Sequence, residues 1–416
     1  MRVPDIAFFD TFIKYDRLRE KDLEKYAKEL ASGKKILTPS DNTVDNIRSL
    51  RFKKLKSDIE TYNRNIDLVK TNLDVAESTL GNIVEAGKET RVDIINLMNY
   101  GVLDYEDAQV IRDYLQSMRD YMINQANIPV GDSRLFGGVK SQVNPFDSRG
   151  IYQGEFVDTT VPVAPGVELN TTFIGKDYLG TIPSGVWIDT NSDNTVDPNE
   201  INHKIGMVKA IDDIIHIIDS GNLNRLHSYI SDLGYNSPTD IVVGTGESGT
   251  LNISYGSLNI SVNYNDTMTL NDLVNAINTA PTNNGNVEAF VFQDKEGVFR
   301  LGLLGKDKDI NMIISDTTGS LIKRTGELRR ILETFDKGFD GISQHRSLIG
   351  AQINVADNIK TMNQQQKVEF EELISKIEDA DYAGVIAKLE QARIAYQALL
   401  ASIAQNKDLS LLRFYD

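Results

Sequence analysis

Apolar residues recur at helical spacing through the first third of the chain. From residue 59 onward they follow alternating steps of three and four positions: Ile59, Tyr62, Ile66, Val69, Leu73, Ala76, Leu80 and Ile83. Such a pattern, sustained over several heptads, predicts a long helix with a coiled-coil seam. A helix is also predicted over about residues 6–30, because Gly33 follows it as glycine does past a helix C-terminus.

The C-terminal region, residues 327–416, has the same character. One apolar stripe runs from Leu328 to Ile349, and a second helix is predicted beyond the polar break at residues 379–381. Seams of this length at both ends favour long helices that pair with each other or with other chains. A globular helical bundle is the alternative.

The composition changes between these ends, since residues 131–326 hold most of the Gly, Pro, Thr and Asn. Short β-branched and aromatic runs predict strands at Val157–Val163, Val167–Ile174, Val186–Ile188, Ile241–Val243, Leu251–Val262, Val287–Phe292 and Val298–Leu304. Two helices, about 200–218 and 270–278, are predicted among them. The predicted fold class is α+β, with long N- and C-terminal coiled-coil helices packed together and an inserted mostly-β (α+β) outer domain.

The pattern divides the chain into three predicted parts. They are terminal helices (1–45 with 380–416), a coiled-coil helical domain (46–140 with 326–379) and the inserted outer domain (141–325, with candidate lobes 141–237 and 238–325). An insert of this kind needs only close entry and exit points on the helical part.

Charge and cysteine content exclude several classes of function. The 416 residues include 44 Lys and Arg against 60 Asp and Glu, for a net charge of −16, and no cysteine. The acidic balance argues against nucleic acid and against an anionic membrane surface as the main partner. The lack of cysteine excludes disulfides, thiolate zinc sites and a cysteine nucleophile. No apolar run is long enough for a membrane span, and no signal peptide is expected at the N-terminus.

The search for catalytic motifs finds little. The four histidines, His203, His216, His227 and His345, lack the spacing of a helical metal motif, and we expect surface or core roles for them. Gly244–Gly249 matches the glycine pattern of a dinucleotide-binding loop, which requires a helix directly after it. Residues 251–255 instead alternate like a strand, so a hairpin turn is the favoured interpretation.

One segment has the spacing of a metal site. Residues 189–200 place oxygen-bearing side chains at positions 1, 3, 5, 9 and 12 of an EF-hand-type calcium loop, and position 7 would ligate through its carbonyl. The candidate calcium ligands are Asp189, Asn191, Asp193, Thr195, Asp197 and Glu200. Asn194 replaces the usual glycine at position 6, a change that asparagine tolerates. Alternatively, Asp197 and Glu200 cap the helix predicted to follow.

A resemblance to a known family appears at residues 30–42. A helix ending in Ser-Gly-Lys, then an extended turn with Pro39, Ser40 and Asp41, resembles the signature of the flagellin superfamily. Asn42 and Thr43 stand where that signature has Asp-Pro. Three shorter segments are similar to the hook-associated protein 3 branch: the start at Met1–Pro4, the Leu-Phe-Gly-Gly turn within 131–138, and the end at 410–415. Residues 269–301 resemble a module that flagellins share with filament caps.

The resemblance implies a structural protein and not an enzyme, located outside the cell in the bacterial flagellum. It implies export through the flagellar type III apparatus, and a ring of copies that joins hook-associated protein 1 to flagellin. An export chaperone would bind the C-terminal helices. Flagellin itself, the bulk filament subunit, is the alternative, and an enzyme or binding module in the central region is a third possibility.

No cofactor is required under this interpretation, apart from the candidate structural calcium. Within the signature turn, Pro39 and Asp41 are expected to fix the angle between the first helix and the long second helix, with Asp41 capping the helix that starts near Thr43. Assembly is expected to depend on this turn, on the apolar stripes of the two terminal helices and on the C-terminal end. The residues concerned are Ile6, Phe9, Ile13, Leu23, Pro39, Asp41, Leu389, Tyr396, Leu399, Ile403, Leu411 and Leu412.

Overall fold

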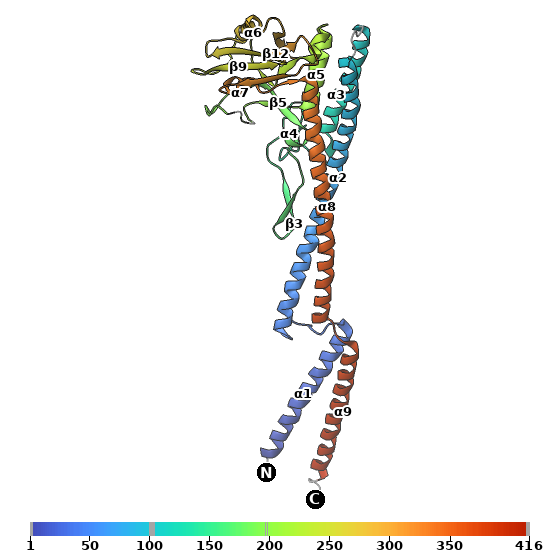
Figure 1. The fold of residues 1–416 in the computed structure, drawn as a ribbon. Coiled ribbons are helices and arrows are strands. Elements are labelled where there is room, and N and C mark those ends of the chain that lie inside the picture. The colour runs from blue at the N-terminus through green and yellow to red at the C-terminus, as the bar shows by residue number, and fades with distance from the viewer. Residues whose placement is uncertain (1–2, 100–104, 196, 198, 413–416) are drawn as a thin grey trace. The chain divides into compact units, whose positions relative to one another are not determined.

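The computed structural model describes residues 3–99, 105–195, 197 and 199–412, with side chains over 10–99, 106–195, 197 and 199–405 (Figure 1). The chain forms two compact units. One, here called the terminal unit, contains residues 1–64 and 358–416, and the other, the central unit, contains residues 65–357. The three-part division predicted from the sequence stays a prediction.

Five long helices account for both ends of the chain. They are α1 (Val3–Ser32), α2 (Thr43–Asn99), α3 (Tyr105–Ala126), α8 (Ile331–Glu378) and α9 (Tyr382–Leu412). Helices α2 and α8 contribute to both units, whereas α1 and α9 lie in the terminal unit and contact each other. No helix in the described part of the chain is long and apolar enough to cross a membrane.

The predicted coiled-coil seam is the core of the helical part of the central unit. Along α2, the side chains of Ile66, Val69, Leu73, Ala76 and Leu80 are completely buried. Ion pairs also join α2 to α8, where Arg91 contacts Asp336 at 2.6 Å. The apolar stripe of α8 is buried as well, at Ile331, Phe335, Ile342, Ile349 and Ala356.

The inserted region contains short helices and strands. Its first half contains β1 (Pro129–Val130), β2 (Ser133–Arg134), β3 (Thr160–Ala164), β4 (Val167–Asn170), α4 (Gly175–Tyr178), β5 (Thr181–Val186), β6 (Asn202–Ile205), α5 (Gly206–Asp219), η1 (Leu223–His227), β7 (Tyr229–Ser231) and β8 (Leu233–Gly234). Its second half contains β9 (Ser248–Tyr255), β10 (Leu258–Asn265), α6 (Leu270–Thr279), β11 (Val287–Gln293), β12 (Phe299–Gly305), β13 (Met312–Asp316), α7 (Ser320–Thr325) and β14 (Leu328–Arg330).

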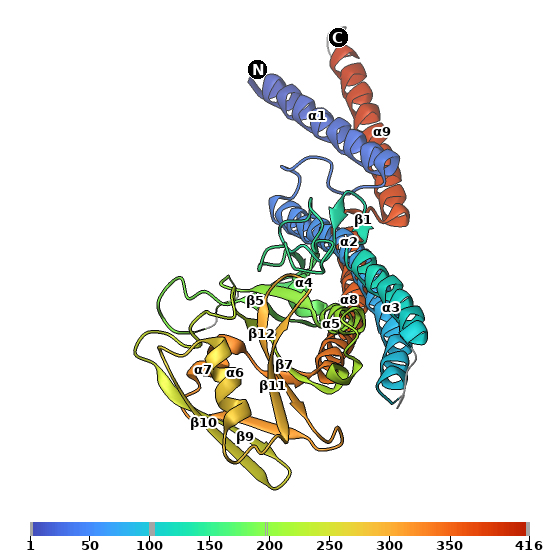
Figure 2. The same cartoon turned by 90° about the horizontal axis from the view of Figure 1, so that it is seen from above.

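These strands form three main sheets, with orders β10-β9-β13, β11-β12-β7-β14 and β6-β5-β8. One apolar core joins the first two sheets to α6, through residues such as Ile253, Ile260, Leu273 and Leu301. In Figure 2, β9 and β10 lie on the side of the β region away from α3. Helix α5, which is almost entirely buried, packs against α3 and connects the β region to the helices. The predicted α+β class is therefore confirmed.

Several sequence-based boundaries were wrong. The predicted helix 200–218 begins only at Gly206, because residues 202–205 pair with β5 as strand β6. The predicted strand 251–262 is two strands, since Gly256 at φ +59° turns the chain between them. Residues 241–243 form no strand: Ile241 makes only an isolated bridge with Thr269, and the amide of the buried Val242 donates to the carbonyl of Met268 at 2.9 Å. Gly244 and Gly246 lie in a turn before β9, whereas Gly249 is already part of β9, and this turn does not close a hairpin.

Candidate functional site

The signature turn joins α1 to α2 within the terminal unit. Gly33 ends α1 at φ +68°, where its amide donates to the carbonyl of Glu29 at 2.9 Å. A Cβ atom at this position would lie 2.7 Å from the hydroxyl oxygen of Tyr382 in α9. The carbonyl of Gly33 also accepts the amide of Ala380 at 2.9 Å. The α1–α2 turn is therefore bonded through its backbone to the turn between α8 and α9.

Glu378, the last residue of α8, is the polar centre of this contact. Its carbonyl accepts the amide of Lys35 at 2.7 Å, and its carboxylate contacts the Ser49 hydroxyl and the Lys53 ammonium group. Burial alone raises the pKa of Glu378, but the hydrogen bonds from Lys53 and Ser49 outweigh burial and lower it. Lys34 adds an ion pair to the neighbouring Asp379 at 2.5 Å. These bonds link residues more than 300 positions apart in the sequence.

Asp41 acts differently from the prediction that it caps α2. Its carboxylate accepts the backbone amides of Thr38 at 2.7 Å and Leu37 at 3.0 Å, so it holds the turn upstream of the helix. Asn42 is the capping residue, because its side-chain oxygen accepts the amide of Asp45 at 3.2 Å. Pro39 is exposed within the turn. The hinge role predicted for Pro39 and Asp41 stays a prediction.

The predicted assembly stripes are only partly covered. Within α9, Leu389, Tyr396, Leu399 and Ile403 are half-buried. In α1, Leu23 is half-buried, Ile13 is 50% exposed, and no apolar side chain is buried among those described. The side chains of Ile6, Phe9, Leu411 and Leu412 lie outside the described residues. Helices α1 and α9 therefore leave a large part of their apolar surface in contact with water.

The described residues of the candidate calcium loop, 189–195, 197, 199 and 200, follow β5 and precede β6 and are exposed or half-buried. Ser192 and Asn194 have φ of +61° and +58°, so Asn194 takes the left-handed conformation required at position 6. The carboxylate of Glu200 already accepts the indole N–H of Trp187 at 3.1 Å and the amide of Thr190 at 2.8 Å. The pKa of Glu200 is lowered to about 2: burial acts against this change, and the Trp187 and Thr190 hydrogen bonds outweigh it.

The other candidate ligands bond mostly to one another. Asn191 donates to Asp193 at 3.1 Å and to Asp197 at 3.0 Å, and Thr195 donates to Asp193 at 2.7 Å. Within the described residues, no three His, Cys, Asp or Glu side chains form a group that could hold a metal ion. The capping alternative is wrong. The carboxylate of Glu200 does accept the amide of Asp197, but the element that follows is strand β6 and not a helix. Calcium binding stays a prediction.

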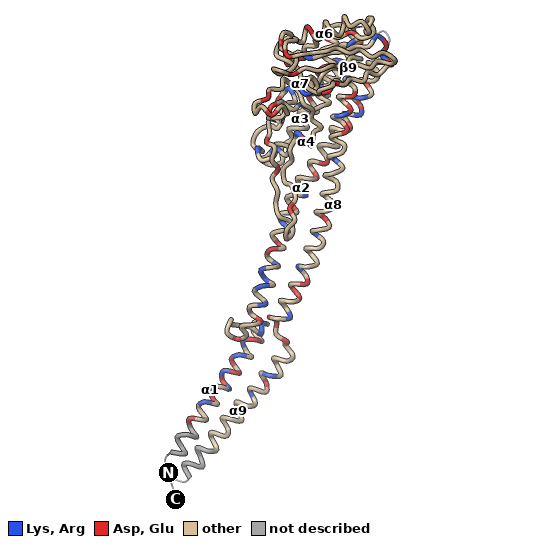
Figure 3. The backbone as a smooth tube through the Cα atoms, turned by 60° about the vertical axis from the view of Figure 1, so that its left-hand side comes forward, with Lys and Arg blue, Asp and Glu red and all other residues tan. Residues whose placement is uncertain are grey.

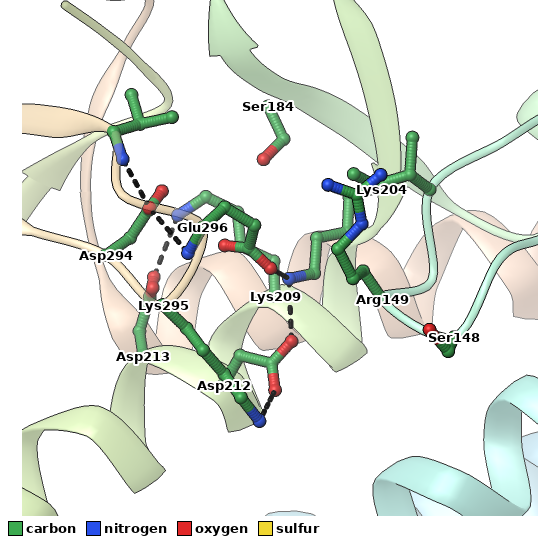
Figure 4. Close-up of polar contacts among 12 residues, drawn as sticks. Ser148, Arg149, Ser184, Lys204, Lys209, Asp212, Asp213, Asp294, Lys295 and Glu296 are labelled. Carbon is green, nitrogen blue, oxygen red and sulfur yellow. Dashed lines mark hydrogen bonds and ion pairs between the residues drawn. The ribbon is translucent and has the colours of Figure 1, made fainter. Parts of the chain in front are cut away.

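A buried network of charged side chains, shown in Figure 4, was not predicted from the sequence. Asp212 of α5, 2% exposed, contacts Arg119 of α3 and Lys204 of β6, each at 2.6 Å. Lys204, 1% exposed, also contacts Glu296 in the loop between β11 and β12. Burial raises the pKa of Asp212, but the positive charges of Lys204 and Arg119 outweigh this effect and lower it. The network connects the helices of the central unit to its β region.

A second buried pair continues from the same loop. Asp294 contacts Arg300 of β12 at 2.5 Å, and both side chains are 1% exposed. The guanidinium of Arg300 also donates to the carbonyl of Ser231 at 3.2 Å. The sequence did contain a signal for Arg300, because it interrupts the apolar run 298–304 that otherwise predicts a buried strand. It contained none for Lys204, which follows the polar residues Asn202 and His203. Their partners could not be read from it, since they come from distant segments.

Comparison with known proteins identifies one segment. Residues 16–139 match the family model of the bacterial flagellin N-terminal helical region. This part of the chain is therefore of the flagellin type, and the resemblance seen in the signature turn is confirmed over these residues. No curated protein matches the chain.

Several solved structures of flagellar proteins are similar to this chain at low identity. A flagellar hook-associated protein from Vibrio parahaemolyticus has a TM-score of 0.46 and 14% identity, covering 82% of this chain and 100% of its own. FlgL from Xanthomonas campestris has a TM-score of 0.44 and 15% identity, covering 77% and 98%. FlgL from Bacillus cereus has a TM-score of 0.42 and 12% identity, covering 78% and 99%.

Proposed function

We propose that this chain is a structural component of the bacterial flagellum, in the junction between the hook and the flagellin filament. The match of residues 16–139 to the flagellin N-terminal helical region carries the proposal. The sequence features at both ends, which resemble the hook-associated protein 3 branch, favour a junction protein over a filament subunit. Flagellin itself is the second candidate, since the matched region is named after it.

The physical support for an assembling protein lies in the terminal unit. Its two terminal helices contact each other but leave apolar side chains such as Ile13, Leu18 and Ile394 about half exposed or more. A helix pair of this kind gains little stability alone, because helical stability comes mainly from tertiary burial. Contacts with neighbouring copies, with hook-associated protein 1 and with flagellin would bury these faces. We further propose export through the flagellar type III apparatus, with a chaperone on the C-terminal helices.

The deciding experiment is immuno-electron microscopy of intact flagella with an antibody against residues 141–325. Label in a narrow band at the hook–filament boundary is the expected result. Label along the whole filament would replace the junction role with that of flagellin. Absence of label from every flagellum of a motile culture would overturn both.

A second experiment tests the signature turn in this role. The double variant Pro39→Ala and Asp41→Ala frees the amides of Leu37 and Thr38 and loosens the turn. We expect export to persist while assembly at the hook fails, as measured by secreted protein and by filament number. Lys54→Ala, on an exposed part of α2, is the matched control. Normal filaments on the double variant would contradict a hinge role.

A further inference from the structure

Strand β10 is an edge strand that nothing in its own sequence protects. It ends the sheet order β10-β9-β13, and all eight of its residues pair with β9 without a bulge. It contains no proline and no charged residue, and neither does β9, which is labelled in Figure 3. Soluble proteins usually protect such edges with charges, proline, bulges or a covering segment, because a free edge is a template for another chain.

Other edges in the same region are protected. The edge of β11 is covered by Asn278 of α6, whose side-chain amide both donates to the carbonyl and accepts the N–H of Ala289, each at 2.8 Å. On β13, the amide of Met312 donates to the hydroxyl of Tyr229 at 3.0 Å. The lack of protection on β10 is therefore a local feature, not a general property of these sheets.

The geometry of the hairpin shows which groups of β10 are free. Residues 256–257 form a two-residue loop, so the flanking pair Tyr255–Leu258 is hydrogen-bonded and the bonds then alternate along the ladder. The backbone N–H and C=O groups of Asn259, Ser261 and Asn263 consequently point away from β9. Within the described part of the chain, these outward groups have no hydrogen-bond partner.

We propose that β10 pairs with β10 of a second copy of this chain, antiparallel and centred on Ser261. In this register Ser261 lies opposite Ser261 of the other copy, and Asn259 opposite Asn263. Buried side chains such as Ile260 then lie opposite the other copy's Val262, so both sheets keep one apolar and one polar face. The outward backbone groups of all three polar residues become paired.

The uncharged hairpin removes local repulsion between two copies at this edge. Two chains with a net charge of −16 repel each other, and direct opposition of like charges across paired strands is destabilising. The hairpin β9–β10 brings no charged side chain of either copy into the pair. The exposed side chains of β10 are Asn and Ser, which are short enough to allow the close approach of two strands.

This contact goes beyond the proposed junction function. A two-fold contact joins the same surface on both copies, whereas neighbours in a ring meet through unlike surfaces. The β10 pair therefore belongs to free copies and not to ring neighbours. If the β10 pair does not form, the proposed junction function is unaffected. If the junction function is wrong, the β10 pair can still form.

Disulfide trapping in the full-length chain tests the register, because the chain has no cysteine of its own. Opposite residues of a hydrogen-bonded antiparallel pair have Cα atoms about 5.5 Å apart, which lies within disulfide range. We expect purified Ser261→Cys to form a cross-linked dimer under mild oxidation about tenfold faster than Ser315→Cys. Ser315 is the matched control, because it is an exposed serine on β13, at the other edge of the same sheet.

A mixing experiment separates this register from nonspecific contact. Asn259→Cys and Asn263→Cys copies should cross-link with each other when mixed, and much more slowly when each is oxidised alone. Thermal melting of each reduced variant checks that it folds. Equal rates for Ser261→Cys and Ser315→Cys in folded protein would overturn the proposal, as would equal rates for mixed and unmixed copies. An extended segment of another protein would then be the occupant to seek.

Discussion

Helix α2 passes through both units, and several of its apolar side chains are exposed in the terminal unit, although Ile59 is buried there. In the terminal unit, Val44, Leu50 and Leu55 are exposed, whereas Ile66 and Leu73 in the central unit are completely buried. In the sequence, both stretches have the periodicity of an amphipathic helix. The difference lies in the surroundings: the central unit adds α3, α5 and the β region to the α2–α8 pair, and the terminal unit adds no comparable layer to it. Helical periodicity therefore identifies an apolar face, but not what covers it.

Hydrogen exchange should show the largest contrast between the units. Helices α1 and α9 bury little apolar surface, so we expect them to open with a free energy near zero in the dilute chain. Residues 66–99 should exchange only through global unfolding. Amide exchange followed by mass spectrometry measures both. Strong protection of the amides of residues 10–30 would contradict this expected difference between the two units.

Removal of one charge from the buried network should cost the most stability. Asp212→Asn leaves Arg119 and Lys204 buried without their carboxylate, and such a loss typically costs about 3–5 kcal/mol. Urea unfolding followed by circular dichroism measures the change. Asp113→Asn is the matched control, since Asp113 is an exposed partner of Arg112 and should change stability by less than about 0.5 kcal/mol. Equal losses of stability in the two variants would show that the network does not stabilise the fold.

The same substitution at two places along α2 sharpens the comparison. Leu73→Ala removes a completely buried side chain and should lower the free energy of unfolding by about 2–5 kcal/mol. Leu50→Ala, at a side chain that is 56% exposed, should lower it by less than about 0.5 kcal/mol. If Leu50 instead contributes to assembly, its variant will reduce incorporation into flagella while the free chain unfolds normally.

His203 predicts a pH dependence within the central unit. Burial, with a smaller contribution from Lys176, lowers the pKa of His203 to about 4. The unfolded chain binds this proton near pH 6.5, so stability should be complete above that pH and fall between about 6.5 and 4. His203→Gln should flatten this part of the pH profile of unfolding. An unchanged slope in the variant would assign the dependence to another group.

Calcium is expected to have the smallest effect. If residues 189–200 bind calcium, the wild-type chain should melt at a higher temperature in millimolar calcium than in EDTA. At ten times the dissociation constant, calcium raises the free energy of unfolding by about 1.4 kcal/mol. The double variant Asp189→Ala and Glu200→Ala should lose this calcium-dependent difference, whatever its own melting temperature. Identical melting of the wild-type chain in calcium and in EDTA would end the idea.

The candidate sites divide in the same way as the helices. The signature turn was recognised from its residues, because Gly33 and Pro39 restrict their own backbone and such local effects are visible in sequence. Asp41 was predicted to cap α2, but Asn42 does so, since both are good capping residues and only geometry decides between neighbours. The network around Asp212 was missed altogether, because its members are separated by up to 177 positions.

The sequence by itself determined the long helices, the apolar seam of α2, the α+β class and the flagellin-type signature. These features depend on periodicity and on backbone preferences, which act over a few residues. Only the tertiary structure decided where α5 begins, which apolar faces are covered, how Asp212 and Lys204 are paired, and which strand ends a sheet. Strand β10 looks like any half-buried strand in sequence. Its outer edge is free because no strand in the described part of the chain pairs with β10 on the side away from β9, and pairing between distant segments is a property of the whole fold.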